Sequence, residues 1–167
     1  YEGFEIEALF AATRNLQLFL NYGSLDASYE EFFTDINQFD GLGTVEDASF
    51  LEPRNAPEHT LGVGFQYNAQ VGNGEIEIYA KYSETGKTQT SLLNLTSGAF
   101  DGSEDVSANI GYYQDNWNVV LFGRNLTDEQ FEVPTLLGGS FTTGPYFSMS
   151  NAGKRPRAFG IEFGYEF

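Results

Sequence analysis

The residue types that most often perform catalysis are scarce in this sequence. His59 is the single histidine, and it stands between Pro57 and an apolar segment, where a polar loop residue is the expected role. A Ser-His-Asp mechanism needs a nucleophile beside its base, and the sequence shows no nucleophile-elbow motif. Cysteine is absent, which excludes disulfides and thiolate metal sites. We therefore expect a protein without catalytic residues.

Acidic residues are abundant, and one stretch has part of the spacing of a calcium loop. Asp101-Gly-Ser-Glu-Asp105 places oxygens at the first, third and fifth positions, but the twelfth position is Tyr112 and not a glutamate. We interpret this stretch as a solvated acidic loop. Neither a metal ion nor a cofactor is expected.

A second group of charged residues recurs at every other position of several segments. Paired carboxylates can perform acid–base catalysis, but this recurrence is typical of the polar wall of a lumen. The two basic members share the face of the carboxylates and can pair with them, as can basic groups of a further domain. The residues expected to face the lumen are Glu5, Glu7, Glu75, Glu77, Lys81, Arg124, Glu162 and Glu166.

Strict alternation of apolar and polar residues is the dominant pattern and predicts strands. The clearest case is the C-terminal strand, whose large apolar residues alternate with Ala, Gly and Glu. Those apolar residues are Phe159, Ile161, Phe163, Tyr165 and Phe167. Six further strands are expected at 3–10, 16–22 (extending to about 29), 61–68, 75–82, 106–113 and 117–124.

The connections between these strands alternate in length. Short turns fall near residues 13, 72 and 115, and long polar connections cover about 31–57, 83–104 and 126–156. Barrels of the bacterial outer membrane have short periplasmic turns and long extracellular loops. Aromatic residues near strand ends suit the membrane–water interface: Tyr22, Tyr67, Tyr82, Tyr112, Trp117 and Tyr165. A soluble β-sandwich also alternates and is the competing fold.

Composition limits the class of protein further. The formal net charge is −16, which excludes nucleic acid as a partner. No apolar run approaches the roughly 18 residues of a membrane helix. The sequence shows no signal peptide and starts at Tyr1, so we expect a mature or truncated product. The predicted fold class is all-β: an antiparallel transmembrane β-barrel segment of about seven strands.

Two short motifs flank the last long connection and carry a family resemblance. The first motif is Asn-Leu-Thr-Asp at the end of a strand, and the second is a Pro-Arg pair before a closing strand with a terminal Phe. Both resemble the C-terminal part of TonB-dependent outer-membrane receptors. The family usually has Tyr where Phe131 stands. The N-terminal stretch Tyr1-Glu-Gly-Phe-Glu-Ile-Glu7 is similar to an earlier strand of the family. The matching motif residues are Asn125, Leu126, Thr127, Asp128, Pro156 and Arg157.

The resemblance implies an architecture and a set of partners. Family members close about 22 strands around a plug domain, so residues 1–167 would be the C-terminal portion of a barrel, without plug or earlier strands. The implied partners are outer-membrane lipid, the rest of the barrel with its plug, an inner-membrane energy-coupling protein and the barrel-assembly machinery. That machinery would read the last strand as its signal, and the location would be the bacterial cell outer membrane.

Three functions follow from these observations. The first is a transporter segment for uptake of a scarce solute such as a metal chelate, vitamin or glycan. The second is a barrel component with a scaffolding role, and the third is a soluble β-sandwich binding module. The acidic loops have two possible roles. One is to keep the surface soluble and bridged by divalent ions, and the other is to bind a cationic or metal-bearing ligand. An aromatic loop with Phe141, Tyr146 and Phe147 can contact a ligand by stacking.

Overall fold

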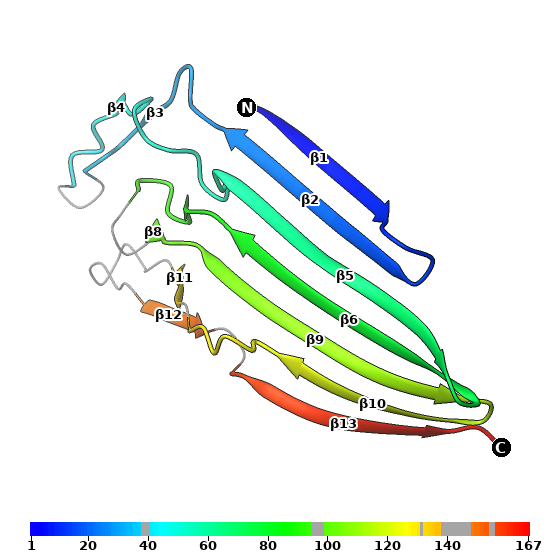
Figure 1. Cartoon of the computed structure of the whole chain (residues 1–167). Coiled ribbons are helices and arrows are strands. Elements are labelled where there is room, and N and C mark those ends of the chain that lie inside the picture. The colour runs from blue at the N-terminus through cyan, green and yellow to red at the C-terminus, as the bar shows by residue number, and fades with distance from the viewer. Residues whose placement is uncertain (38–40, 95–98, 131, 138–147, 154–155) are drawn as a thin grey trace.

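An antiparallel sheet of seven strands is the largest element of the fold (Figure 1). The computed structural model describes residues 1–37, 41–94, 99–130, 132–137, 148–153 and 156–167. Each sheet strand pairs with the next one along the chain, because every connection returns beside the strand that it leaves. The strands are β1 (Glu2–Ala11), β2 (Leu16–Asp26), β5 (His59–Val71), β6 (Gly74–Thr85), β9 (Ser103–Gln114), β10 (Trp117–Arg124) and β13 (Ala158–Tyr165).

The two ends of the sheet differ in their connections. The tight turns lie at one end, where Thr13 Oγ1 accepts hydrogen bonds from the N–H groups of Asn15 and Leu16. Gly72 adopts a φ of 65°, as the turn between β5 and β6 requires. The long connections gather at the other end, which also holds the N-terminus, whereas the C-terminus lies at the turn end (Figure 1).

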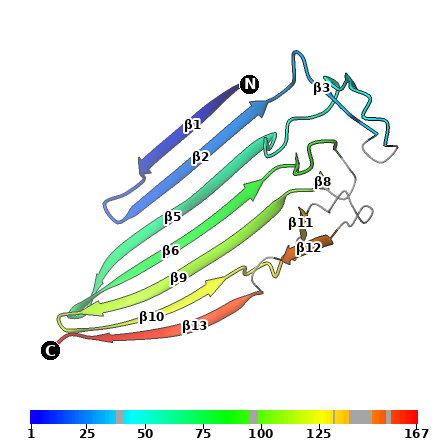
Figure 2. The same ribbon diagram turned by 180° about the vertical axis from the view of Figure 1, so that it is seen from behind.

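The long connections are more ordered than the sequence predicts, because each contains a short hairpin. These lie together at the loop end of the sheet in both views (Figures 1 and 2). The sequence pattern predicts none of these hairpin strands, and four of the six have only two residues and so show no periodicity. The hairpin strands are β3 (Phe33–Thr34) with β4 (Glu46–Asp47), β7 (Thr88–Gln89) with β8 (Ala99–Phe100), and β11 (Glu132–Leu137) with β12 (Ser148–Gly153).

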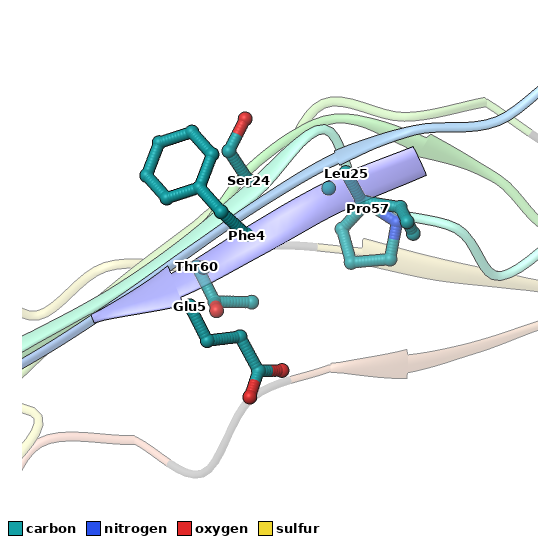
Figure 3. Close-up of a pocket in the computed structure, with 8 residues that line it drawn as sticks. Phe4, Glu5, Ser24, Leu25, Pro57 and Thr60 are labelled. Carbon is teal, nitrogen blue, oxygen red and sulfur yellow. The ribbon is translucent and has the colours of Figure 1, made fainter. Parts of the chain in front are cut away.

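The pairing register gives the sheet one apolar and one polar face. Ile6 lies opposite Tyr22, which lies opposite Leu61, and directly paired residues project to the same side of a sheet. Figure 3 shows the separation at the loop end: Phe4 and Ser24 project to one side, and Glu5 and Thr60 to the other. We call the side of Phe4 and Ile6 the apolar face and the opposite side the polar face.

The apolar face has no second layer packed on it within the described residues. Ile161 and Phe163 are each 68% exposed, and Ile6 is 48% exposed. The buried apolar residues, Ala48 and Leu51, lie instead between β4 and β5 in the first long connection. A sandwich would cover such a face with its second sheet, so the fold matches a barrel wall and not a sandwich. We find no helix in the described parts that is long and apolar enough to cross a membrane.

Several boundaries differ from the sequence predictions. Strand β2 ends at Asp26 and does not run on to Tyr29. His59, expected in a loop, begins β5, because its backbone pairs with Ser24 of β2, and its ring also reaches Glu84 on the other neighbouring strand. The acidic loop predicted at 101–105 is also partly strand, since Ser103 pairs with Thr85 at the start of β9.

Candidate functional site

The polar face brings together the charged residues that the sequence places at alternate positions. Seven of the eight lie on this face by strand register: Glu5, Glu7, Glu75, Glu77, Lys81, Arg124 and Glu162. Glu166 follows β13, and with Glu75, Tyr113 and Asn118 it lines an open cavity of about 390 Å³ at the turn end.

Side-chain amides of β5 donate hydrogen bonds to the carboxylates of β6. Gln66 Nε2 donates to Glu77 Oε1 over 2.7 Å, and Asn68 Nδ2 donates to Glu75 Oε1 over 3.2 Å. Gln70 Nε2 donates to the second oxygen of Glu75 over 3.3 Å. The carboxylates of Glu75 and Glu77 therefore have hydrogen-bond donors other than Lys81 and Arg124. Neither cation forms an ion pair within the described parts of the chain.

Aromatic rings lie flat on the polar face where glycine leaves space. Phe19 stacks on Tyr79 with ring centroids 5.7 Å apart and planes 16° apart. A Cβ atom at Gly64 would lie 2.4 Å from the Phe19 ring, and one at Gly160 would lie 2.3 Å from the Phe122 ring. These glycines are therefore needed for close approach, and they keep the rings against the wall.

Asn125 is the structural centre of the first family motif. It is 3% exposed and adopts a φ of 48°, a conformation that asparagine tolerates better than most residues. Its Nδ2 donates to the Glu129 carbonyl oxygen over 3.0 Å, and its Oδ1 accepts the Glu129 N–H over 3.0 Å. The carboxylate of Glu129 in turn accepts the Glu104 N–H over 2.6 Å. Asn125 thus fixes the turn that starts the last long connection.

The two family motifs meet in space. Arg157 Nη2 lies 3.5 Å from Asp128 Oδ2, so the motif after β10 contacts the motif before β13. Leu126 packs beside Gly123, where a Cβ atom would lie 2.5 Å from Leu126 Cδ2 and 3.3 Å from Phe159. The motif residues Thr127 and Pro156 are exposed. Together these contacts close the base of the last long connection.

Hydrogen bonds also join the first two long connections, which sequence reasoning did not find. Asn94 accepts the Glu52 N–H through Oδ1 over 2.6 Å and donates to the Glu52 carbonyl oxygen over 2.9 Å. The Asn55 N–H donates to the Gln89 carbonyl oxygen over 2.7 Å. Asn94 and Asn55 adopt positive φ angles of 48° and 57°, and their residue type, asparagine, is the sequence signal of such a backbone position.

A polar cluster marks the loop end of the apolar face. His59 Nε2 lies 3.1 Å from Glu84 Oε1, and the Tyr82 hydroxyl donates to Glu84 Oε2 over 2.9 Å. Between this cluster and the turn end the face is apolar. Aromatic residues recur near the turn end, where the ring centroids of Tyr112 and Trp117 are 5.5 Å apart. This distribution is typical of a membrane boundary.

The structure describes the residues predicted for the last strand but not those predicted for the aromatic loop. Phe159, Ile161, Phe163 and Tyr165 line the apolar face of β13 through their pairs on β10. Phe167 lies beyond the strand and contacts the Tyr165 ring edge-on, with centroids 5.1 Å apart. Phe141, Tyr146 and Phe147 lie outside the described residues.

The hairpin in the first long connection should loosen in acid. The Ser49 hydroxyl, which donates to Asp47 over 2.6 Å, and the Ser49 N–H hold the pKa of Asp47 below its usual value. Because the folded pKa is lowered, the stabilisation is present above the usual aspartate value of 3.8 and is lost as pH falls through the folded pKa. Amide exchange at Ser49, corrected for intrinsic rates, should therefore accelerate in this range. Asp47→Asn should remove the pH dependence, whereas Glu46→Gln should retain it; equal behaviour of both variants would contradict the assignment.

Comparison with known proteins places the fold. No family model matches the sequence, and no curated protein matches it. The structure resembles the ferric yersiniabactin uptake receptor FyuA from Yersinia pestis, with a TM-score of 0.70 and 14% sequence identity. The sheet has the fold of a β-barrel segment of a TonB-dependent receptor. The match covers 99% of this chain and 23% of the receptor chain, so the chain spans less than a quarter of that protein.

Proposed function

We propose that this chain is part of the barrel wall of a TonB-dependent outer-membrane receptor that takes up a scarce solute. The observation that carries the proposal is the match of the whole sheet to part of an uptake receptor, with a large apolar face that nothing in the described residues covers. Lipid is the environment that stabilises such a face, because exposure of large apolar residues to water favours aggregation.

The remaining roles follow from this placement. The apolar face, including β13, contacts lipid, and the polar face lines the lumen and contacts a plug domain. The long connections lie outside the cell and the turns in the periplasm. The alternating last strand with Phe167 serves as the signal for barrel assembly. The plug and the rest of the barrel couple the segment to an inner-membrane energy complex, and the segment performs no covalent chemistry.

Energised uptake is the test of this proposal. Cells expressing the intact protein that contains these strands are compared with cells lacking it, using labelled ferric citrate, cobalamin and maltodextrin as one probe of each solute class. We expect accumulation of one of these probes, abolished by a protonophore. The metal chelate is the favoured class, since the structural neighbour is a receptor for a ferric chelate. An inserted barrel that accumulates none of the probes would overturn the proposal in favour of a scaffolding role.

A further inference from the structure

The connection before the last strand does not fix the register of that strand. A tight turn determines which residues of a hairpin lie opposite each other, as at the turn from β9 to β10, where Gln114 pairs with Trp117. Residues 125–157 join β10 to β13, and a connection of this length leaves several registers open. A slip of two residues would also leave every side chain on its present face. Alternation therefore does not select the observed register, and something else must.

Two side chains of β10 lie over two glycines of β13 on the polar face. Phe122 pairs directly with Gly160, and a Cβ atom added at this glycine would overlap the Phe122 ring. Asn118 pairs directly with Gly164, where a Cβ atom would lie 2.6 Å from Asn118 Nδ2. The Arg124 guanidinium carbon lies 5.1 Å from the centroid of the Phe122 ring and helps to hold the ring in place. Each of the two side chains thus occupies the space that a glycine leaves.

A slip of two residues would destroy both fits. Phe122 would then lie opposite Ala158 or Glu162, and its ring would meet a Cβ atom at either position. Such overpacking forces side chains off their preferred rotamers and costs stability. The slip would also move Arg157 by about 7 Å along β10 and break its ion pair with Asp128. The observed register is the one that satisfies the two fits and the ion pair together.

The same arrangement recurs at a second pair of strands that a long connection joins. Across β2 and β5, Phe19 pairs with Gly64 and Asn21 pairs with Gly62, and each side chain occupies the place of the missing Cβ atom. In the other four strand pairs of the described sheet, no glycine has the side chain of its direct partner as its nearest neighbour. Three of those four pairs are joined by tight turns, which set the register themselves.

We propose that the fits of Phe122 over Gly160 and of Asn118 over Gly164 set the register in which β13 pairs with β10. This device takes the place of a tight turn, as ring-over-glycine pairs can in a sheet. The inference rests on the proposed function in taking β13 as the last strand of a membrane barrel wall, and it does not depend on the solute. A slip would displace the terminal Phe167 by about 7 Å relative to β10, and with it the proposed assembly signal.

Disulfide trapping in the intact protein folded into liposomes measures the register, after replacement of any cysteine elsewhere in that protein. Leu121→Cys with Ile161→Cys reports the observed register, because these two residues pair directly. Leu121→Cys with Phe163→Cys reports a slip of two residues, which preserves the type of backbone pair, so the two cross-links are comparable. We expect Phe122→Gly to lower the ratio of observed to slipped cross-links about tenfold, since the ring no longer opposes the slip.

Val120→Gly is the matched control. It introduces a glycine on the same face of β10, but its partner is Glu162 and not a glycine, so the register should be retained. The double variant Phe122→Gly with Gly160→Phe moves the ring to β13 and the glycine to β10. We expect it to restore the wild-type ratio to within about twofold.

Three results would overturn the proposal. The first is an unchanged cross-linking ratio in Phe122→Gly, and the second is an equal loss in Val120→Gly. The third is a double variant that slips as often as Phe122→Gly alone. If Phe122→Gly does not insert at all, recovery of insertion by the double variant supports the fit, and continued failure overturns it. The outcome is separable from the uptake test, because a barrel in the observed register that accumulates no solute would reject transport alone.

Discussion

Replacing Ile161 with arginine is expected to prevent stable insertion of the protein into a bilayer. Ile161 lies near the middle of β13, pairs with Leu121 and is 68% exposed on the apolar face. A charged residue on the lipid face near the bilayer midplane costs about 2–4 kcal/mol. Folding of the purified protein into liposomes, followed by its altered gel mobility without heating and by urea titration, measures the loss.

The adjacent position supplies the matched control for this variant. Glu162 pairs with Val120 and projects to the polar face, so Glu162→Arg introduces the same side chain on the other side of the strand. We expect Glu162→Arg to insert with a free energy of unfolding close to that of the wild type. If Glu162→Arg reduced membrane insertion more than Ile161→Arg, the face assigned to lipid would be the wrong one.

Removing the Asn125 side chain is expected to destabilise the last long connection strongly. Asn125→Ala loses the two hydrogen bonds to the Glu129 backbone and places alanine at a φ of 48°. At about 1 kcal/mol for each hydrogen bond and about 1 kcal/mol for the left-handed conformation, the loss should be about 3 kcal/mol. Urea unfolding in detergent and protease sensitivity between β10 and β13 measure it.

Two further substitutions separate the causes of that loss. Asn125→Gly keeps the backbone conformation and should lose only the hydrogen-bond part. Asn125→Asp keeps the oxygen that accepts the Glu129 N–H but sets a carboxylate oxygen against the Glu129 carbonyl oxygen, so it should be no more stable than Asn125→Gly at neutral pH. An Asn125→Ala protein as stable as the wild type would show that this turn does not hold the connection in place.

Strand periodicity made most of the sheet predictable from sequence. Residues 75–82 alternate cleanly between apolar and polar side chains, and β6 extends this prediction at both ends. Alternation also gave the shared face of seven of the eight charged residues singled out from the sequence, because a strand has a side-chain period of two. The strand ends were predicted less accurately. His59 belongs to β5 because it pairs with Ser24 of β2, and periodicity within one strand does not show where pairing with its neighbour begins.

The loop contacts could not be predicted in the same way. Asn94 and Glu52 lie far apart in the sequence, and their hydrogen bonds depend on backbone positions that no periodic pattern encodes. The contact between Asp128 and Arg157 has a similar origin, although the family resemblance singled out both residues without showing that they meet. The ion pairs expected between Lys81 or Arg124 and the nearby carboxylates stay a prediction. In the described residues, the carboxylates of Glu75 and Glu77 accept hydrogen bonds from side-chain amides of β5 instead.

Nitroxide scanning of β6 tests most directly whether the apolar face contacts lipid. Residues 1–167 contain no cysteine, so single cysteines can be introduced here and labelled one at a time in the intact protein in liposomes, after replacement of any cysteine elsewhere in that protein. Relaxation by oxygen, which partitions into lipid, should be high at Ile76, Ile78 and Ala80 and low at Glu77, Tyr79 and Lys81. Oxygen accessibility that lacks this period of two, or that peaks at Glu77 and Tyr79, would contradict the account.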